Sequence, residues 1–250
     1  MTDVFISYSR RDSEFVRRFY DALDGANREV WIDWESIPRG EEFLKEIYTG
    51  VDAADVFLFV VSRHSLTSEI CNLEVRHARR RGKKIIPVII ELIEGDVFNF
   101  VVAGWFKKSW ENDARETWDD IKQINWSIFT PDRDFAVEFK ALLNEIDTDR
   151  PHMRLHTRYL VQARDWRNAG SAPSLLLIGD QIAAAEAWLN QSTGKVPMIT
   201  ADQREYIAES RRADTIRRRN QRISLLVSAI LGLSALAAGM IGVQAISDAN

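Results

Sequence analysis

The sequence has a single cysteine, Cys71, and only four histidines in 250 residues. One thiol cannot form an intramolecular disulfide, and the scattered histidines match none of the usual zinc-ligand spacings. The motifs Gly-x-Gly-x-x-Gly, Gly-x-x-x-x-Gly-Lys-Ser/Thr and His-Glu-x-x-His are also missing. These absences argue against a disulfide-stabilised domain, a metal centre and the common dinucleotide and triphosphate sites.

The chain also lacks an excess of positive charge and a secretory signal. Its formal net charge is -4, whereas a protein that binds nucleic-acid phosphates needs a basic surface, so we expect no nucleic-acid partner. The first residues, Met1-Thr-Asp-Val-Phe-Ile-Ser-Tyr8, have neither the basic start nor the long apolar run of a signal peptide. We therefore expect this part of the chain to stay in the cytoplasm.

One stretch has no charged residue at all. Residues 223–246 read ISLLVSAILGLSALAAGMIGVQAI, and a helix of this length would span about 30 Å of hydrocarbon. A buried core helix is the alternative, but core helices of small domains are usually shorter and amphipathic. The arginines that precede the stretch are Arg211, Arg212, Arg217, Arg218, Arg219 and Arg222. By the positive-inside rule, we expect a single-pass membrane protein with residues 1–222 in the cytoplasm and a short non-cytoplasmic tail at 247–250.

Small residues recur at a spacing of four in this apolar stretch. The pairs are Ser228 with Gly232, Ala235 with Gly239, and Ala238 with Gly242. Such spacing lets helix backbones approach closely and favours self-association in a membrane. Glycine and alanine are also simply frequent in membrane helices, so the sequence leaves both interpretations open.

The first 149 residues alternate between strand-like and helix-like patterns. Five apolar, β-rich runs are predicted as strands at residues 3–8, 29–34, 55–61, 84–90 and 124–129. Helical periodicity follows each of four runs, at about residues 15–23, 41–51, 67–81 and 135–146. This alternation predicts an α/β fold with a doubly wound parallel sheet, whose ligands bind beyond the carboxyl ends of the strands. Residues 95–120 carry no clear pattern.

Residues 150–222 have a helical pattern and are predicted to form a juxtamembrane region. Breaks at residues 170–173 and 194–197 divide it into two shorter helices and one that continues into the apolar stretch. His152 and His156 lie one helical turn apart in this region. No third ligand accompanies them, so we interpret both as surface residues.

Three motifs in the first half resemble those of the TIR (Toll/interleukin-1 receptor) domain family. Val4-Phe-Ile-Ser-Tyr-Ser-Arg-Arg-Asp12 is similar to the first box of the family, and Ile37-Pro-Arg-Gly40 is similar to its second-strand loop. Ser68-Glu-Ile-Cys-Asn-Leu-Glu74 resembles its Ser-x-x-Cys-x-x-Glu helix. The resemblance implies a flavodoxin-like five-stranded sheet. The region behind it is similar to the linker of bacterial TIR proteins that carry a membrane helix, some of which continue into WD repeats.

The resemblance implies two alternative functions. TIR domains either assemble signalling complexes as scaffolds or cleave the nicotinamide-ribose bond of NAD+. For cleavage, the resemblance makes Glu74 the catalytic carboxylate, and a carboxylate can stabilise the oxocarbenium-like ribose left by nicotinamide. The competing interpretation is that Glu74 is an ordinary solvated helix residue. NAD+ would be a substrate, and no cofactor or metal is expected.

The same resemblance assigns residues to NAD+ binding. The expected contacts are Ser7, Tyr8, Ser9, Arg10, Asp33, Trp34 and Ser68. Backbone N–H groups and Arg10 would meet the pyrophosphate, while Asp33 and Trp34 would line the ribose side. A packed turn with solvated charges is the alternative for these residues. Cys71 is interpreted as a small core residue, because no separate base is placed beside it.

One departure from the family pattern bears on the choice of function. Many members have tryptophan four residues before the glutamate, where this chain has Ile70. Trp34 or Trp105 would then have to supply the aromatic face. We expect a membrane-held NAD+ glycohydrolase that self-associates with other TIR domains in immune, antiphage or cell-death signalling, with a non-enzymatic adaptor as the alternative. In either case the second-strand loop would contact a neighbouring domain.

Overall fold

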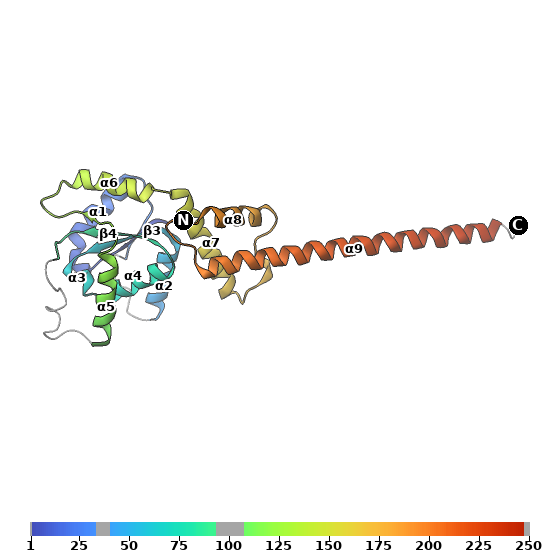
Figure 1. Cartoon of the computed structure of the whole chain (residues 1–250), viewed down its shortest axis with the longest axis horizontal. Coiled ribbons are helices and arrows are strands. Elements are labelled where there is room, and N and C mark those ends of the chain that lie inside the picture. Colours follow the sequence, from blue (N-terminus) through green and yellow to red (C-terminus); the bar gives the residue numbers. More distant parts are fainter. Residues whose placement is uncertain (1, 34–40, 94–107, 248–250) are drawn as a thin grey trace.

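The computed structural model describes residues 2–33, 41–93 and 108–247 (Figure 1). Within helices, the side chains of residues 41, 42, 108–111, 113 and 233–247 are not described. The second-strand loop at 35–40, Trp34 and Trp105 therefore lie outside the described residues. An α/β domain and a set of helices behind it make up the described part of the chain.

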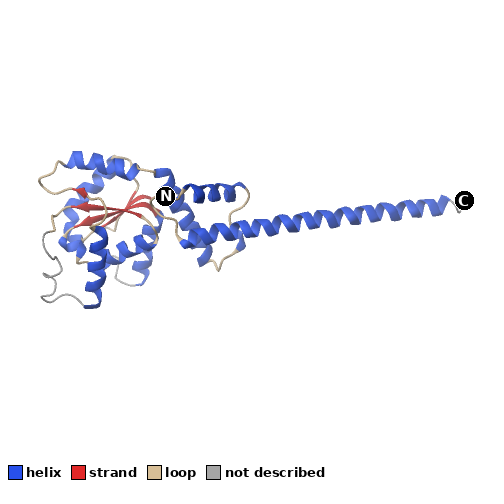
Figure 2. Cartoon of the chain, in the orientation of Figure 1, coloured by secondary structure: helices blue, strands red, loops and turns tan. Residues whose placement is uncertain are grey.

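A five-stranded parallel sheet forms the centre of the α/β domain (Figure 2). The strands are β1 (Thr2–Ser7), β2 (Val30–Trp31), β3 (Ala54–Val61), β4 (Lys84–Ile89) and β5 (Ser127–Ile128), in the spatial order β2-β1-β3-β4-β5. Every neighbouring pair is parallel, and β3 lies between β1 and β4 with all eight residues buried. The predicted five-stranded parallel α/β fold is confirmed.

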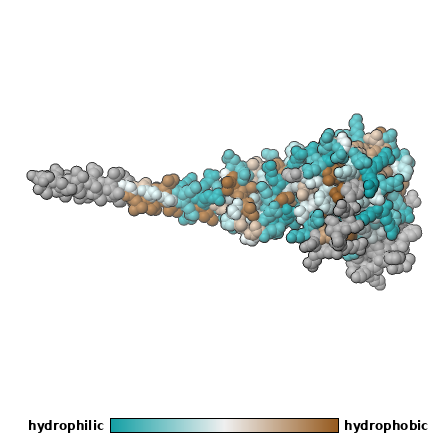
Figure 3. Space-filling model, turned by 180° about the vertical axis from the view of Figure 1, so that it is seen from behind, coloured by the Kyte–Doolittle hydropathy of each residue, from teal (hydrophilic) through white to brown (hydrophobic). Residues whose placement is uncertain are grey.

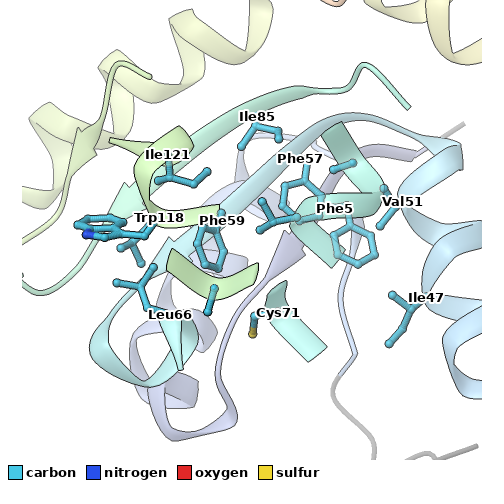
Figure 4. Packing of buried hydrophobic residues seen from close by; sticks show 14 of the residues in the cluster. Phe5, Ile47, Val51, Phe57, Phe59, Leu66, Cys71, Ile85, Trp118 and Ile121 are labelled. Carbon is cyan, nitrogen blue, oxygen red and sulfur yellow. The ribbon is translucent and has the colours of Figure 1, made fainter. Parts of the chain in front are cut away.

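Helices cover both faces of the sheet. The helices α1 (Ser13–Gly25) and α6 (Phe135–Asp147) cover one face, while α2 (Glu41–Ala53), α4 (Glu69–Arg80) and α5 (Lys108–Ile121) cover the other. On the second face, the aromatic rings of Phe5, Phe57 and Phe59 pack with Cys71 (Figure 4). Alternate residues of each strand face opposite layers, so one sheet supplies two separate cores.

Several element boundaries differ from the predicted ones. The helix expected at 67–81 corresponds to α4, which begins at Glu69 because the Ser68 hydroxyl accepts a hydrogen bond from the Cys71 backbone N–H and so caps its start. A separate short helix that was not predicted, α3 (Arg63–Leu66), precedes it. β2, an edge strand that pairs with β1 alone, has two residues and is shorter than the strand expected at 29–34. Helix α5 occupies the end of the stretch at 95–120 that had no clear pattern.

The chain continues into α7 (Arg150–Asn168), α8 (Asp180–Gln191) and α9 (Ala201–Ser247), which we call the helical extension. It has its own apolar core, built around Tyr159, Trp166, Trp188 and Tyr206. Helix α7 packs at the amino ends of the strands, where the Thr157 hydroxyl donates to the Ala54 carbonyl oxygen at 3.2 Å. The extension and the carboxyl ends of the strands thus lie at opposite ends of the sheet (Figure 1).

The interpretation of the two histidines as surface residues is wrong. His152 and His156 are buried where α7 meets the segment before α9. Nε2 of His152 lies 2.9 Å from the Pro197 carbonyl oxygen, and Nε2 of His156 lies 3.1 Å from that of Met198. Burial lowers the pKa of His156 to about 3, so this imidazole is neutral. Both imidazole rings thus connect α7 to the segment before α9.

Helix α9 leaves the body of the protein and points away from it (Figure 1). Beyond a hydrophilic, arginine-rich part, its described surface becomes apolar (Figure 3). The membrane-spanning helix expected at 223–246 is not supported: among the described residues, none of the helices combines the length and apolar character needed to cross a membrane. The side chains of 233–246 lie outside the described part.

Candidate active site

The carboxyl ends of β1 and β2 bring the first box and the Asp33 region together. β1 ends at Ser7, and the next turn is a short 3-10 helix, Arg10–Asp12, whose start is capped by the Ser9 side chain. β2 ends two residues before Asp33. Helix α4 begins at the same edge and carries Glu74 in its second turn. The sheet topology therefore collects residues that are far apart in the sequence.

The closest contact in this cluster joins the Ser7 hydroxyl to the Glu74 carboxylate. Ser7 Oγ donates to Glu74 Oε2 at 2.5 Å, and the residues are 1% and 7% exposed. Cys71, Val75 and Ala78 share the inward face of α4 with Glu74 and pack on the core. The register of α4 thus directs Glu74 toward β1. The interpretation of Glu74 as an ordinary solvated helix residue is wrong.

The surroundings of Glu74 change its acidity. Burial raises its pKa to about 8, the negative charge of Asp33 adds to the rise, and the hydrogen bond from Ser7 opposes it. Burial penalises the charged carboxylate because it removes water that would otherwise solvate it. The side chain is therefore mostly protonated at neutral pH in the free chain. A cation next to Glu74 would favour its charged form.

Asp33 connects the first box to the end of β2. The Tyr8 hydroxyl donates to the Asp33 carbonyl oxygen at 2.9 Å, and Arg10 Nη2 donates to Asp33 Oδ2 at 2.9 Å. Arg10 is half exposed, with 51% of its side-chain surface accessible, whereas Asp33 is mostly covered. One guanidinium thus stands at the rim of the cluster beside one carboxylate, and an exposed ion pair of this kind is weak enough to exchange partners.

The remaining predicted site residues are Ser9, Ser68 and Trp34. Ser9 caps the 3-10 helix and Ser68 caps α4, so both side chains already bond to backbone N–H groups. Trp34 lies outside the described residues. Ile70, in the first turn of α4, is partly buried against the core. The structure brings together Ser7, Tyr8, Arg10, Asp33 and Glu74, and it shows Ser9 and Ser68 at helix starts of the same edge.

The prediction for Cys71 is confirmed. Its thiol is buried in the core between α4 and the sheet (Figure 4), and burial raises its pKa far above the ordinary value. A thiol in such surroundings stays protonated, and the thiolate is the reactive form. Cys71 is therefore a packing residue.

Sequence reasoning missed a second polar cluster at the same edge. Ser62, directly after β3, donates from its hydroxyl to Asp12 Oδ2 at 2.6 Å, and burial raises the pKa of Asp12. Ser62 also caps α3, with a reciprocal hydrogen bond involving Ser65. A serine pair at a spacing of three after a buried strand is the signal that could have indicated this cap. The cluster fixes the loop after β1 to the end of β3.

Two hollows of the described surface lie away from Glu74. One, of about 370 Å³, is lined by Phe15, Phe129 and Phe135 with Arg18 and Arg133. The other, of about 900 Å³, lies between the end of α4, α5 and residues 196–198. Neither contains Ser7, Asp33 or Glu74.

The first part of the chain is thus an α/β domain with a five-stranded parallel sheet and a buried carboxyl group at the carboxyl edge of that sheet. The family model described as TIR domain matches residues 4–123. Residues 4–123 therefore resemble the TIR domain family in sequence.

Solved structures and curated proteins give further comparisons. TIR domains in the structure of the activated Roq1 resistosome directly recognizing the pathogen effector XopQ are 18% identical, with 58% of this chain and 99% of that chain covered and a TM-score of 0.48. The TIR domain of the Toll-related receptor TRR-2 from Hydra magnipapillata is also 18% identical, with 49% and 97% covered and a TM-score of 0.35. No curated protein matches the sequence. The expected bacterial type and similarity to WD-repeat proteins find no support in these comparisons.

Proposed function

We propose that the chain is an NAD+ glycohydrolase that acts when its TIR domains assemble in immune or cell-death signalling. The observation that carries the proposal is the buried carboxyl group of Glu74, held by Ser7 at 2.5 Å at the carboxyl edge of the sheet. A carboxyl group with a strongly raised pKa at a ligand-binding edge is typical of a catalytic site. NAD+ is the substrate, and the reaction uses no other cofactor.

The chemistry follows from the charge that develops on the substrate. The bond between ribose C1′ and the nicotinamide nitrogen breaks, and its electron pair goes to the nicotinamide ring. The ribose becomes oxocarbenium-like, and ionised Glu74 stabilises this positive charge. Water then adds to C1′ and loses a proton, which gives ADP-ribose. A cyclic product forms instead when an adenine nitrogen adds to C1′.

The positive nicotinamide ring provides a way to ionise Glu74. An opposite charge within about 4–6 Å favours the charged form of a carboxyl group. Binding of NAD+ would therefore lower the pKa that burial has raised. Arg10 is suited to the pyrophosphate, because its half-exposed guanidinium can exchange Asp33 for a phosphate oxygen. Asp33 then faces the ribose side.

The proposed activity requires assembly of several chains, because Glu74 is only 7% exposed in the single chain. A substrate as large as NAD+ needs an open site, so a neighbouring TIR domain has to help form it. We assign this role to the second-strand loop at 35–40, as expected from the family resemblance. The proposal therefore requires that copies of this chain form homo-oligomers.

The direct test is nicotinamide release from NAD+ by the purified full chain, concentrated on liposomes. Activity should disappear in Glu74→Gln, which keeps the shape and removes the charge. Glu69→Gln is the matched control, because Glu69 is exposed in the first turn of the same helix. Full activity in Glu74→Gln would remove Glu74 from the mechanism.

A non-enzymatic adaptor is the second candidate function. Ile70 favours it, because this partly buried side chain offers no aromatic face for stacking on nicotinamide. An adaptor would show no NAD+ turnover in the assembled state. It would still capture other TIR domains, and Pro38→His, in the second-strand loop, would abolish that capture.

Membrane attachment with a cytoplasmic TIR domain remains a proposal from the sequence. In its support, the described apolar side chains between Ile223 and Leu231 are 47% to 71% exposed. Carbonate extraction of membranes from cells that express the full chain tests the attachment. Release into the soluble fraction would contradict it.

Self-association through α9 is a separate part of the proposal. Gly232 has no atom outside its own helix within 4 Å, so the helix surface there is open to a partner. Replacing Gly232, Gly239 and Gly242 by leucine should lower nicotinamide release and leave attachment intact. Unchanged release would restrict the role of this segment to attachment.

A further inference from the structure

Helix α4 extends from the candidate site to the helical extension. It begins after Ser68 at the carboxyl edge of the sheet and ends at Arg80, close to the amino end of β4. Glu74 lies in its second turn, and His77 follows one turn later. α2 runs between the same two edges and ends at Ala53, next to Asp52. Both helices therefore meet at the end of the sheet that α7 covers.

Asp52 is a buried carboxylate at this meeting point. Its Oδ1 lies 2.8 Å from His77 Nε2 and 3.1 Å from Arg81 Nε, and the residue is 2% exposed. The ring of His77 also stacks on Tyr48 of α2, with centroids 4.1 Å apart. The far half of the Glu74 helix is thus fixed to α2 by the Asp52 carboxylate and by this ring stacking.

The second oxygen of Asp52 faces the helical extension. Arg164 of α7 places Nη1 at 3.4 Å from Asp52 Oδ2. Buried Lys83 donates from Nζ to the backbone carbonyl oxygens of Asp52 and Ala54, at 2.7 Å each. Arg81 contacts Asp202 of α9 at 3.2 Å, so the residue that follows α4 is held by α2 and by the extension.

The Asp52 carboxylate and the cationic groups around it stabilise one another. Burial alone would raise the pKa of Asp52, but the hydrogen bond from His77 and the charges of Arg81 and Lys83 outweigh it and hold the pKa below its ordinary value. The carboxylate is therefore ionised. Removal of its charge would leave the partly buried side chains of His77, Arg81 and Arg164 without their shared charged acceptor, which weakens all three contacts.

We propose that Asp52 is a positioning residue that ties the Glu74 helix to the helical extension, so that docking of the extension sets the position of Glu74. The residue acts through His77 and Arg81 on the orientation of α4, and Arg164 is the link to α7. The contact of 2.5 Å between Ser7 and Glu74 depends on that orientation. The effect on catalysis rests on the proposed NAD+ cleavage, whereas the mechanical link does not.

Hydrogen exchange of the full chain tests the link without any substrate. Asp52→Asn and Arg164→Gln should speed amide exchange in peptides that cover Glu69–Arg80, including the turn around Glu74. Arg211→Gln is the matched control, because Arg211 pairs with Glu186 inside the extension. If Asp52→Asn fails to fold, Arg164→Gln still gives the answer, since Arg164 lies at the edge of the cluster. Exchange that stays unchanged around Glu74 in Arg164→Gln would overturn the proposal.

Nicotinamide release tests the consequence for catalysis. In Arg164→Gln, kcat should fall on the order of 10-fold with KM nearly unchanged, because a small misplacement of a catalytic group slows chemistry more than binding. Arg164→Lys should restore part of the rate, since it keeps the charge. A wild-type chain that cleaves no NAD+ would refute the proposed function alone, and the exchange result would still decide the role of Asp52.

Discussion

The charge of Glu74 should make the stability of the protein depend on pH, and Glu74→Gln should remove that dependence. Burial raises the pKa of this carboxyl group from 4.5 to about 8. The folded state therefore binds a proton that the unfolded state releases between these two values. The free energy of unfolding should fall as the pH rises from 4.5 to about 8, and the loss is complete above that range.

The magnitude follows from the size of the pKa change. A shift from 4.5 to about 8 corresponds to a destabilisation on the order of 5 kcal/mol above pH 8, at about 1.4 kcal/mol per pH unit. Glutamine keeps an oxygen that can accept the Ser7 hydrogen bond and has no charge to bury. The variant should therefore match the wild type near pH 4.5 and be more stable by several kcal/mol above pH 8.

Urea unfolding of the two full-length chains, followed by circular dichroism at a series of pH values, measures the difference. Glu69→Gln serves as the control, because it removes one carboxylate from an exposed position of the same helix. An offset between Glu74→Gln and the wild type that does not grow with pH would refute the assignment of a buried, proton-binding carboxyl group.

Two further predictions concern Ser7 and a tight turn. Ser7→Ala should move the pH midpoint of NAD+ cleavage to higher values, because it removes the hydrogen bond that lowers the pKa of Glu74; a midpoint that stays or falls would contradict this role. Gly82→Ala should lower the free energy of unfolding by more than about 2 kcal/mol, because Gly82 has φ +63° and an added Cβ would meet the Met198 carbonyl oxygen at 2.6 Å. Gly170→Ala, at φ +66° with nothing within 4 Å, should cost only about 1 kcal/mol, and equal losses in urea unfolding would show that the close contact contributes nothing.

Local patterns were sufficient to predict the sheet. The apolar run at 55–61 predicted a strand, and all eight residues of β3 are buried, as in a strand covered on both faces. The helix predicted at 67–81 contains both Cys71 and Glu74. The structure adds that both lie on the face that meets the sheet, which Val75 and Ala78 continue into the core.

Contacts between distant segments could not be predicted from local patterns. Glu74 meets Ser7 across 67 positions of the sequence, and Asp52 meets Arg164 across 112. A single polar residue in an amphipathic helix gives no sign of such a partner. The same limit explains the two histidines, since His152 and His156 have the spacing of a surface pair and are covered only when the segment before α9 folds over them.

The end of β2 shows a different limit. The sequence of residues 29–34 is β-rich throughout, but among the described residues 29–33 only Val30 and Trp31 pair with β1. An edge strand has hydrogen-bonding partners on one side alone, so propensity is a weak guide to where its pairing stops. The predicted strand was therefore too long.

Nicotinamide release by the assembled wild-type chain, compared with Glu74→Gln under the same conditions, tests the central claim most directly. The buried carboxyl group at the edge of the sheet predicts NAD+-dependent release in the wild type and loss of at least two orders of magnitude in the variant. Equal rates in the two chains, or no release from an assembled wild-type chain, would contradict it.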